Sequence, residues 1–138
     1  MSLGSVMTEL LALADGGPPA ATAIEQAFAA RSTRHDRDVG RKGDVHLTMQ
    51  GDIAFLKIWE DSRGWGAYTD VSVTNGSLAD LEAVVGPTKP MPRNPDDFSS
   101  GDKRSAYVTR AGKSIRVFAE LDKADPTKVR KVTVHFQR

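Results

Sequence analysis

Residues 45–73 read VHLTMQGDIAFLKIWEDSRGWGAYTDVSV, which is three strand-like segments separated by two short polar stretches. Apolar and polar residues alternate in residues 45–50 and again in residues 65–73, the pattern of strands that bury one face. Between them, residues 53–59 are apolar at every position except Lys57. The glycine-containing stretches that separate the segments favour tight turns. We therefore expect an antiparallel meander here, and this unit decides the fold class.

Helices and further strands are expected on both sides of this meander. Apolar residues recur at helical spacing in residues 6–14 and 19–31. Residues 78–85 form a third helical pattern, with Ser77 as its N-cap and Gly86 as its C-terminal stop. Three more strands are expected over residues 105–110, 114–121 and 128–137. The predicted element order is ααβββαβββ, an α+β fold with a mainly antiparallel sheet and helices packed against it.

The overall composition restricts the function classes. The 138 residues, 39% hydrophobic and 27% charged, are typical of one globular domain spanning residues 1–138, of which residues 1–6 could be left by cloning. The 19 Lys and Arg residues nearly balance the 18 Asp and Glu residues, so no global field attracts nucleic acid or anionic lipid. No apolar run approaches the roughly 20 residues that span a bilayer. With no membrane partner and no signal-peptide pattern, we expect a cytoplasmic protein.

Residues able to support catalysis or metal binding are few. The sequence contains no cysteine, which excludes disulfides, thiol nucleophiles and thiolate metal sites. His35 indicates either a metal or acid–base cluster with Asp36 and Asp38 or, more simply, a solvated linker. His46 and His135 could meet on the polar face of a sheet. Since no nucleophile elbow or phosphate-binding loop occurs either, we expect no catalytic residue, no metal and no cofactor, and we favour a protein that is not an enzyme.

Basic residues gather in one part of the chain, as they do in many nucleic-acid-binding proteins. They are Arg31, Arg34, Arg37, Arg41 and Lys42, and they precede the strands that carry Trp59, Trp65 and Tyr68. Such a combination could form a platform for single-stranded nucleic acid. However, aspartates dilute the cluster and no aromatic RNA-binding signature occurs. Nucleic acid is therefore the less favoured partner.

The segment from Leu78 to Arg138 has a distinctive order of features. A short helix ends in VVGP (residues 84–87), a long loop follows, and the strands close in VRKVTV (residues 129–134). In these features the segment resembles one unit of the small α+β repeat of β-lactamase-inhibitor-like and outer-membrane assembly lipoprotein domains. The resemblance covers less than half of the chain. It implies a binding module, of the inhibitor or immunity type, and not an enzyme.

The strand over residues 53–59 carries apolar residues on both of its faces. Alternation puts Leu56 and Ile58 on the face opposite Trp59, and it adds Tyr68 of the next strand to the face of Leu56 and Ile58. Three short helices cover one face of a sheet more easily than two. We therefore hypothesise that another chain, most simply a second copy in a homodimer, covers Leu56, Ile58 and Tyr68. The alternative is that the protein's own helices cover both faces.

Two tryptophans flank the turn that follows this strand. Trp59 and Trp65 are separated by five residues, so they are expected to lie opposite each other on one face. They would form either a pair buried beneath a helix or an exposed contact patch.

These features together predict a non-catalytic binding module whose partner is another protein or a second copy of itself. The candidate partner-binding residues are Leu56, Ile58, Trp59, Trp65 and Tyr68. The alternative function is a small enzyme or ligand-binding protein that uses the proline-rich loop over residues 87–103 as a lid.

Overall fold

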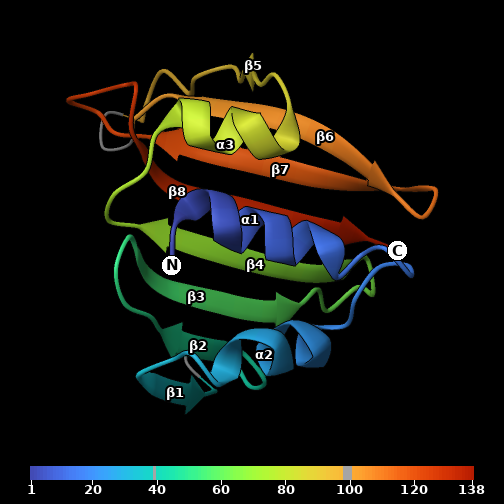
Figure 1. Ribbon diagram of the computed structural model, residues 1–138. Coiled ribbons are helices and arrows are strands. Elements are labelled where there is room, and N and C mark those ends of the chain that lie inside the picture. The colour runs from blue at the N-terminus through green and yellow to red at the C-terminus, as the bar shows by residue number, and fades with distance from the viewer. Residues whose placement is uncertain (39, 98–100) are drawn as a thin grey trace.

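The strand-forming segments all join a single sheet in the computed structural model, which describes residues 1–38, 40–97 and 101–138. Among these residues the helices are α1 (Leu3–Ala12), α2 (Ala21–Ala29) and α3 (Leu78–Val85). The strands are β1 (Arg34–Arg37), β2 (Val45–Thr48), β3 (Ile53–Glu60), β4 (Gly66–Val73), β5 (Lys89–Pro90), β6 (Lys103–Arg110), β7 (Lys113–Leu121) and β8 (Val129–Gln137). The predicted α+β class and antiparallel sheet are confirmed (Figure 1).

The sheet is built from two similar halves. Its strand order is β1-β2-β3-β4-β8-β7-β6-β5, and each pair of neighbours is antiparallel. Helix α2 precedes the meander β1 to β4, and helix α3 precedes the meander β5 to β8. The last strands of the two meanders pair at the centre, where Thr69 lies opposite Val134. One arrangement, a helix followed by four strands, is thus used twice.

Local sequence signals explain where the helices begin and end. The Ser77 hydroxyl accepts a hydrogen bond from the Asp80 N–H at 3.0 Å, and the Asp80 carboxylate accepts one from the Ser77 N–H at 3.2 Å. This capping box starts α3, and Gly86 ends it with φ +84°, as predicted. Helix α1 begins earlier than predicted, because a second capping box at Ser2 starts it.

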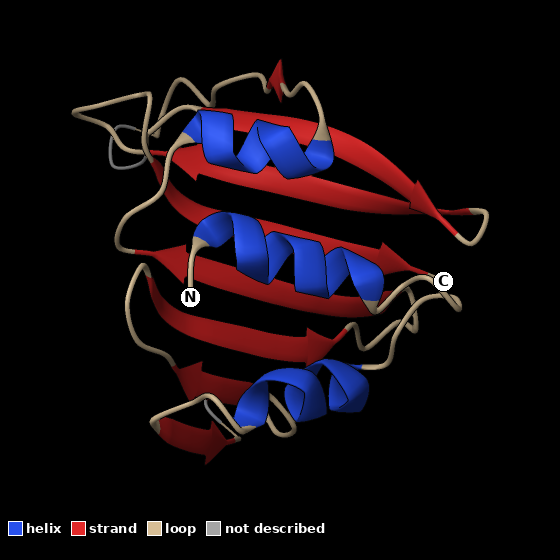
Figure 2. Ribbon diagram, in the orientation of Figure 1, coloured by secondary structure: helices blue, strands red, loops and turns tan. Residues whose placement is uncertain are grey.

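The core lies between the helices and one face of the sheet. Figure 2 shows all three helices on this same side, with α1 in front of the central strands. Wholly buried side chains from the helices are Val6, Met7, Leu10, Ile24, Phe28 and Leu81, and those from the strands are Leu47, Ile53, Leu56, Ile58, Val71, Val132, Val134 and Phe136. Burying one such side chain contributes about 1.5–3 kcal/mol. Alternate residues of the same strands point to the other face, which no described helix covers.

Two strands were missing from the predicted order, and both lie at the edges of the sheet. Residues 34–37, expected to be linker, form β1, whose side chains are polar because an edge strand meets water. Within the expected loop over residues 87–103, Lys89 and Pro90 form the short β5 against β6. Residues 98–100 of that loop lie outside the described part of the chain.

Candidate interaction surface

The face of the sheet opposite the helices, here called the open face, carries a row of large side chains. Five residues on five adjacent strands are successive partners in the sheet register: Trp59, Tyr68, His135, Arg116 and Tyr107. They come from β3, β4, β8, β7 and β6 in that order. We call this set the aromatic row. It joins the two halves of the chain across the central β4–β8 pair.

The rings at one end of the aromatic row stack on one another. The ring centroids of Trp59 and Tyr68 lie 5.1 Å apart with an interplanar angle of 6°. Those of Tyr68 and His135 lie 3.9 Å apart at 4°. Since neighbouring strands are about 4.8 Å apart, rings that stand upright on adjacent strands meet face to face. Both faces of the Tyr68 ring are therefore occupied.

Cations and further aromatic rings surround this row. The guanidinium of Arg116 lies 4.8 Å from the centre of the Phe118 ring. The ammonium of Lys57 lies 5.3 Å from the centre of the Trp59 ring and 3.8 Å from the Asp44 carboxylate. Such contacts between cations and rings hold long side chains in place on the surface. The open face is thus an ordered mixture of aromatic and basic groups.

His135 is the buried member of the row, with only 2% of its surface exposed. Its Nε2 atom lies 3.1 Å from the Trp65 carbonyl oxygen, which can only accept, so Nε2 carries the hydrogen. Its Nδ1 atom is buried and has no hydrogen-bond partner among the described residues. Burial lowers the pKa of His135, and the nearby Arg116 cation lowers it further, against the opposing effect of the Trp65 carbonyl. The imidazole is therefore neutral at pH 7.

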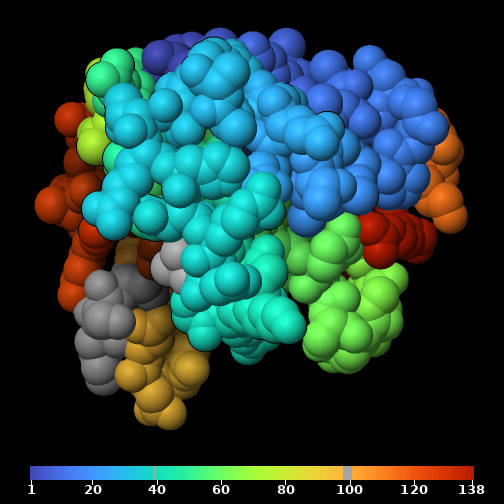
Figure 3. All heavy atoms as spheres, turned by 90° about the horizontal axis from the view of Figure 1, so that it is seen from below, coloured from blue at the N-terminus to red at the C-terminus, as the bar shows by residue number. Residues whose placement is uncertain are grey.

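Two cavities open on this face. One of about 430 Å³ is lined by Gly64, Trp65, Arg116, His135, Gln137 and Arg138. The other, of about 250 Å³, is lined by Met91, Lys103, Phe118, Ala119, Glu120, Lys131 and Thr133. Met91 belongs to the segment over residues 87–103 that the alternative function would use as a lid. Figure 3, with the helices at the top, shows residues 91–97 (gold) extending downward beyond the open side of the sheet.

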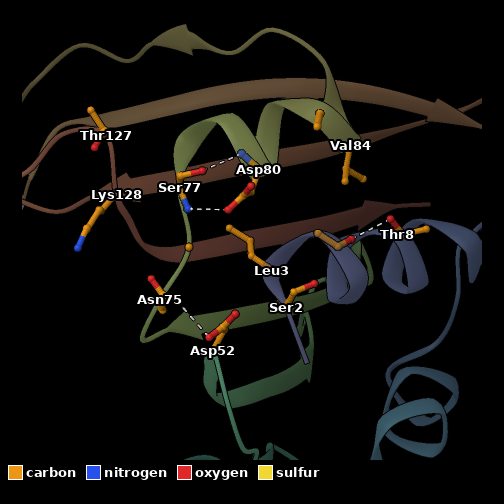
Figure 4. Close-up of a pocket in the computed structure, with 13 residues that line it drawn as sticks. Ser2, Leu3, Thr8, Asp52, Asn75, Ser77, Asp80, Val84, Thr127 and Lys128 are labelled. Carbon is orange, nitrogen blue, oxygen red and sulfur yellow. Dashed lines mark hydrogen bonds between the residues drawn. The ribbon is translucent and has the colours of Figure 1, made fainter.

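A larger cavity, of about 550 Å³, lies on the helix side between the start of α1 and α3 (Figure 4). Several of its polar lining groups are already engaged. Ser2 and Ser77 cap their own helices, and the Asn75 amide donates to the Asp52 carboxylate at 3.4 Å. The capped N–H groups of both helices are satisfied within the chain, so they are not free to bind a ligand in this cavity.

The structure corrects which face of β3 the helices cover and the face on which Tyr68 lies. Leu56 and Ile58 are both 0% exposed and lie on the helix side of the sheet, so the prediction that another chain covers them is wrong. Trp59 pairs with Tyr68 and not with Trp65. The sequence predicted residue 65 opposite Trp59, whereas the structure places residue 68 there. A register shift by three positions is odd, so it exchanges the two faces of β4 relative to β3. Tyr68 therefore shares the open face with Trp59.

Trp65 lies outside the strands at the rim of the open face. It is 54% exposed, and the Arg63 guanidinium lies 3.7 Å from the centre of its ring. Its carbonyl, as noted, accepts from His135. Of the predicted contact residues, Trp59, Tyr68 and Trp65 are thus brought together on one side of the molecule. Sequence reasoning missed Arg116 and Tyr107, because nothing in the sequence shows that β8 and β4 are neighbours.

The other histidines do not gather into a site. The Nε2 atom of His35 donates to the buried carboxylate of Glu25 on α2 at 2.6 Å, and Arg37 contacts the same carboxylate at 2.8 Å. This cluster ties the edge strand β1 to α2. His46 and His135 both lie on the open face, but β3 and β4 separate their strands, so they do not meet. In the described part of the chain no group of three or more His, Asp or Glu side chains is placed to hold a metal ion.

None of the described helices is both long and apolar enough to cross a membrane. Comparison of the chain with models of protein families, with curated proteins and with solved structures gives no match.

Proposed function

We propose that this protein is a non-catalytic binding module that contacts another protein through its open face. The aromatic row carries this proposal. Trp, Tyr and Arg are the residue types that dominate the binding energy of protein interfaces, and here they form one line across the sheet. Stacking fixes the rings before any partner arrives, so little side-chain entropy is lost on binding.

The orientation of the rings favours a protein partner over a nucleic acid. A single-stranded nucleic acid binds a sheet by stacking its bases on exposed ring faces. Here Trp59 and His135 cover the two faces of Tyr68, which leaves ring edges and the hydroxyl for contact. Edges and hydroxyls suit side chains and main-chain groups of a protein. Tyr107, at the far end of the row, is 64% exposed and free to pack against such a surface.

The architecture supports the same proposal. The resemblance of the C-terminal segment to a small α+β repeat implies a binding module, and the chain uses the unit of one helix and four strands twice. The alternative, a small-ligand site closed by the loop over residues 87–103, would use the cavity beside Met91. That cavity, at about 250 Å³, is below the size of most small-molecule sites, which span about 300–1,000 Å³.

Site-specific photocross-linking tests the proposal. A photoreactive phenylalanine analogue replaces Tyr107 on the open face or, as the control, the exposed Gln26 of α2 on the helix side. Each protein is irradiated in extracts of the cells that produce it. We expect discrete adducts from position 107 that position 26 does not give, and excess parent protein should compete them away. Excess Tyr68→Ala protein should compete less well.

Two outcomes would contradict the proposal. One is the same set of adducts from both positions, and the other is equal competition by the parent and by Tyr68→Ala. An adduct with a second copy of this chain at position 107 alone would identify the partner as the protein itself.

A further inference from the structure

Arg116 lies at the centre of the open face with an unpaired charge. Its side chain is half-buried, and its Nε atom is fully buried without a hydrogen-bond partner among the described residues. The only described contact of its guanidinium is with the Phe118 ring. Burying an N–H donor without a partner is unfavourable, and the half-buried charge has no carboxylate beside it, so such a group is suited to an anionic ligand.

The strands around Arg116 also place more cations than carboxylates on the open face. On β3, β4, β6, β7 and β8 the register places four cations on the open face, Lys57, Lys103, Arg116 and Lys131, and two described carboxylates, Asp70 and Glu120. The Asp70 carboxylate already accepts from the Thr133 hydroxyl at 2.6 Å. The Asp44 carboxylate lies 3.8 Å from the Lys57 ammonium, and with it the count is four cations to three carboxylates. An otherwise nearly neutral chain thus carries a small local excess of positive charge where its aromatic row lies.

We infer that the protein partner places the carboxylate of an Asp or Glu side chain on the guanidinium of Arg116. This inference rests on the proposed function and names the chemistry of the partner at the same surface. A planar guanidinium binds a carboxylate through two parallel hydrogen bonds. The cavity of about 430 Å³ that Arg116 and His135 line gives room for the incoming side chain.

His135 provides an internal reporter of this event. The charged and titratable groups that face it are Arg116 on β7, Asp61 in the turn before β4, and Tyr68 on β4. Of these, the Arg116 cation disfavours protonation of the imidazole and the Asp61 carboxylate favours it. A carboxylate bound on Arg116 offsets the first effect. Binding should therefore raise the pKa of His135 and be accompanied by proton uptake.

NMR titration with small probes tests the inference without the partner. The probes are N-acetyl-aspartate N-methylamide and its uncharged isostere, N-acetyl-asparagine N-methylamide. We expect the aspartate probe to shift the Arg116 Nε–H and His135 ring resonances saturably and to raise the pKa of His135. Because a charge-assisted contact is lost with the amide, the asparagine probe should bind roughly tenfold or more weakly.

Matched variants separate this contact from a general attraction of anions. Arg116→Gln should abolish the response, whereas Lys113→Gln, which removes an equal charge from the same strand, should keep it. Arg116→Lys keeps the charge without the guanidinium fork and should weaken the response, with the amide spectrum reporting that each variant is folded. Equal responses to both probes, no response at Arg116, or an undiminished response in Arg116→Gln would overturn the inference. If position 107 gives cross-links but the NMR titration shows no response, the proposed function is retained and only the inferred contact between Arg116 and a partner carboxylate is rejected.

Discussion

Replacing Leu56 by alanine tests which face of β3 the protein itself covers. Leu56 is 0% exposed on the helix side of the sheet. The change forfeits about 0.8 kcal/mol of transfer free energy for each carbon removed. The cavity left behind raises the expected loss to about 3–5 kcal/mol. A domain has a total stability of about 5–15 kcal/mol, so the variant should remain folded with much of its stability lost.

The neighbouring residue supplies the control. Phe55 points to the open face, half-buried, with its ring centroid 4.5 Å from that of His46. Solvent fills the space in Phe55→Ala, so we expect a loss of about 1 kcal/mol. In urea unfolding followed by tryptophan fluorescence, the midpoint of Leu56→Ala should fall by about 1–3 M, several times the fall for Phe55→Ala.

The measurement is made at two protein concentrations. A loss below about 1 kcal/mol for Leu56→Ala would refute the reasoning, because a side chain sealed beneath helices cannot be truncated so cheaply. A loss for Leu56→Ala that becomes smaller on dilution would also count against it, since it would mean that another chain helps to cover the residue.

Three further substitutions or conditions have defined outcomes. Gly66→Ala should cost about 3 kcal/mol or more by thermal unfolding, because Gly66 has φ +127° and an added Cβ would lie 1.9 Å from the Phe136 carbonyl oxygen; a near-neutral change would contradict this packing. Ser77→Ala removes the hydroxyl that caps α3 and should cost about 1 kcal/mol, and no change in melting temperature would show that the cap with Asp80 is dispensable. The pKa of His135 is lowered by burial. Below about pH 6.5 this histidine therefore binds a proton in the unfolded chain while it remains neutral in the folded protein. Stability should therefore decrease as the pH falls, by up to about 1.4 kcal/mol per pH unit, and His135→Gln should flatten this slope; an equal slope in the variant would assign the effect elsewhere.

Local signals in the sequence predicted most element types. The helix over residues 78–85 was predicted with its correct bounds, because Ser77 and Gly86 mark its two ends chemically. Strands with strict alternation, such as β7, were also recognised. The strand β1 was not, because its residues Arg34–Arg37 carry no apolar alternation. An edge strand exposed to water has no need of one.

Register could not be obtained in the same way. The spacing around the turn after β3 predicts Trp59 opposite Trp65, whereas in the structure Trp59 lies opposite Tyr68. Gly66, at the start of β4, permits the pairing of β4 with β8, since without a Cβ its backbone approaches Phe136 closely. An error of this kind leaves the strand assignment intact and exchanges its two faces. For that reason Tyr68 was predicted to share a face with Leu56, whereas it lies on the open face beside Trp59. Leu56 was correctly placed opposite Trp59, and only the choice of the face that the helices cover was wrong.

The open face becomes one surface only through the pairing of β4 with β8. Before that pairing, the stack of Trp59 on Tyr68 belongs to the first half of the chain, and Arg116 with Tyr107 belongs to the second. His135 joins them, since it stacks on Tyr68 and stands opposite Arg116 in the register. Burial of His135 in this joint favours the neutral imidazole, and the Arg116 cation opposes a second positive charge beside it. The proposed partner carboxylate would remove that conflict, so recognition and the protonation of His135 are coupled through the same central strand pair.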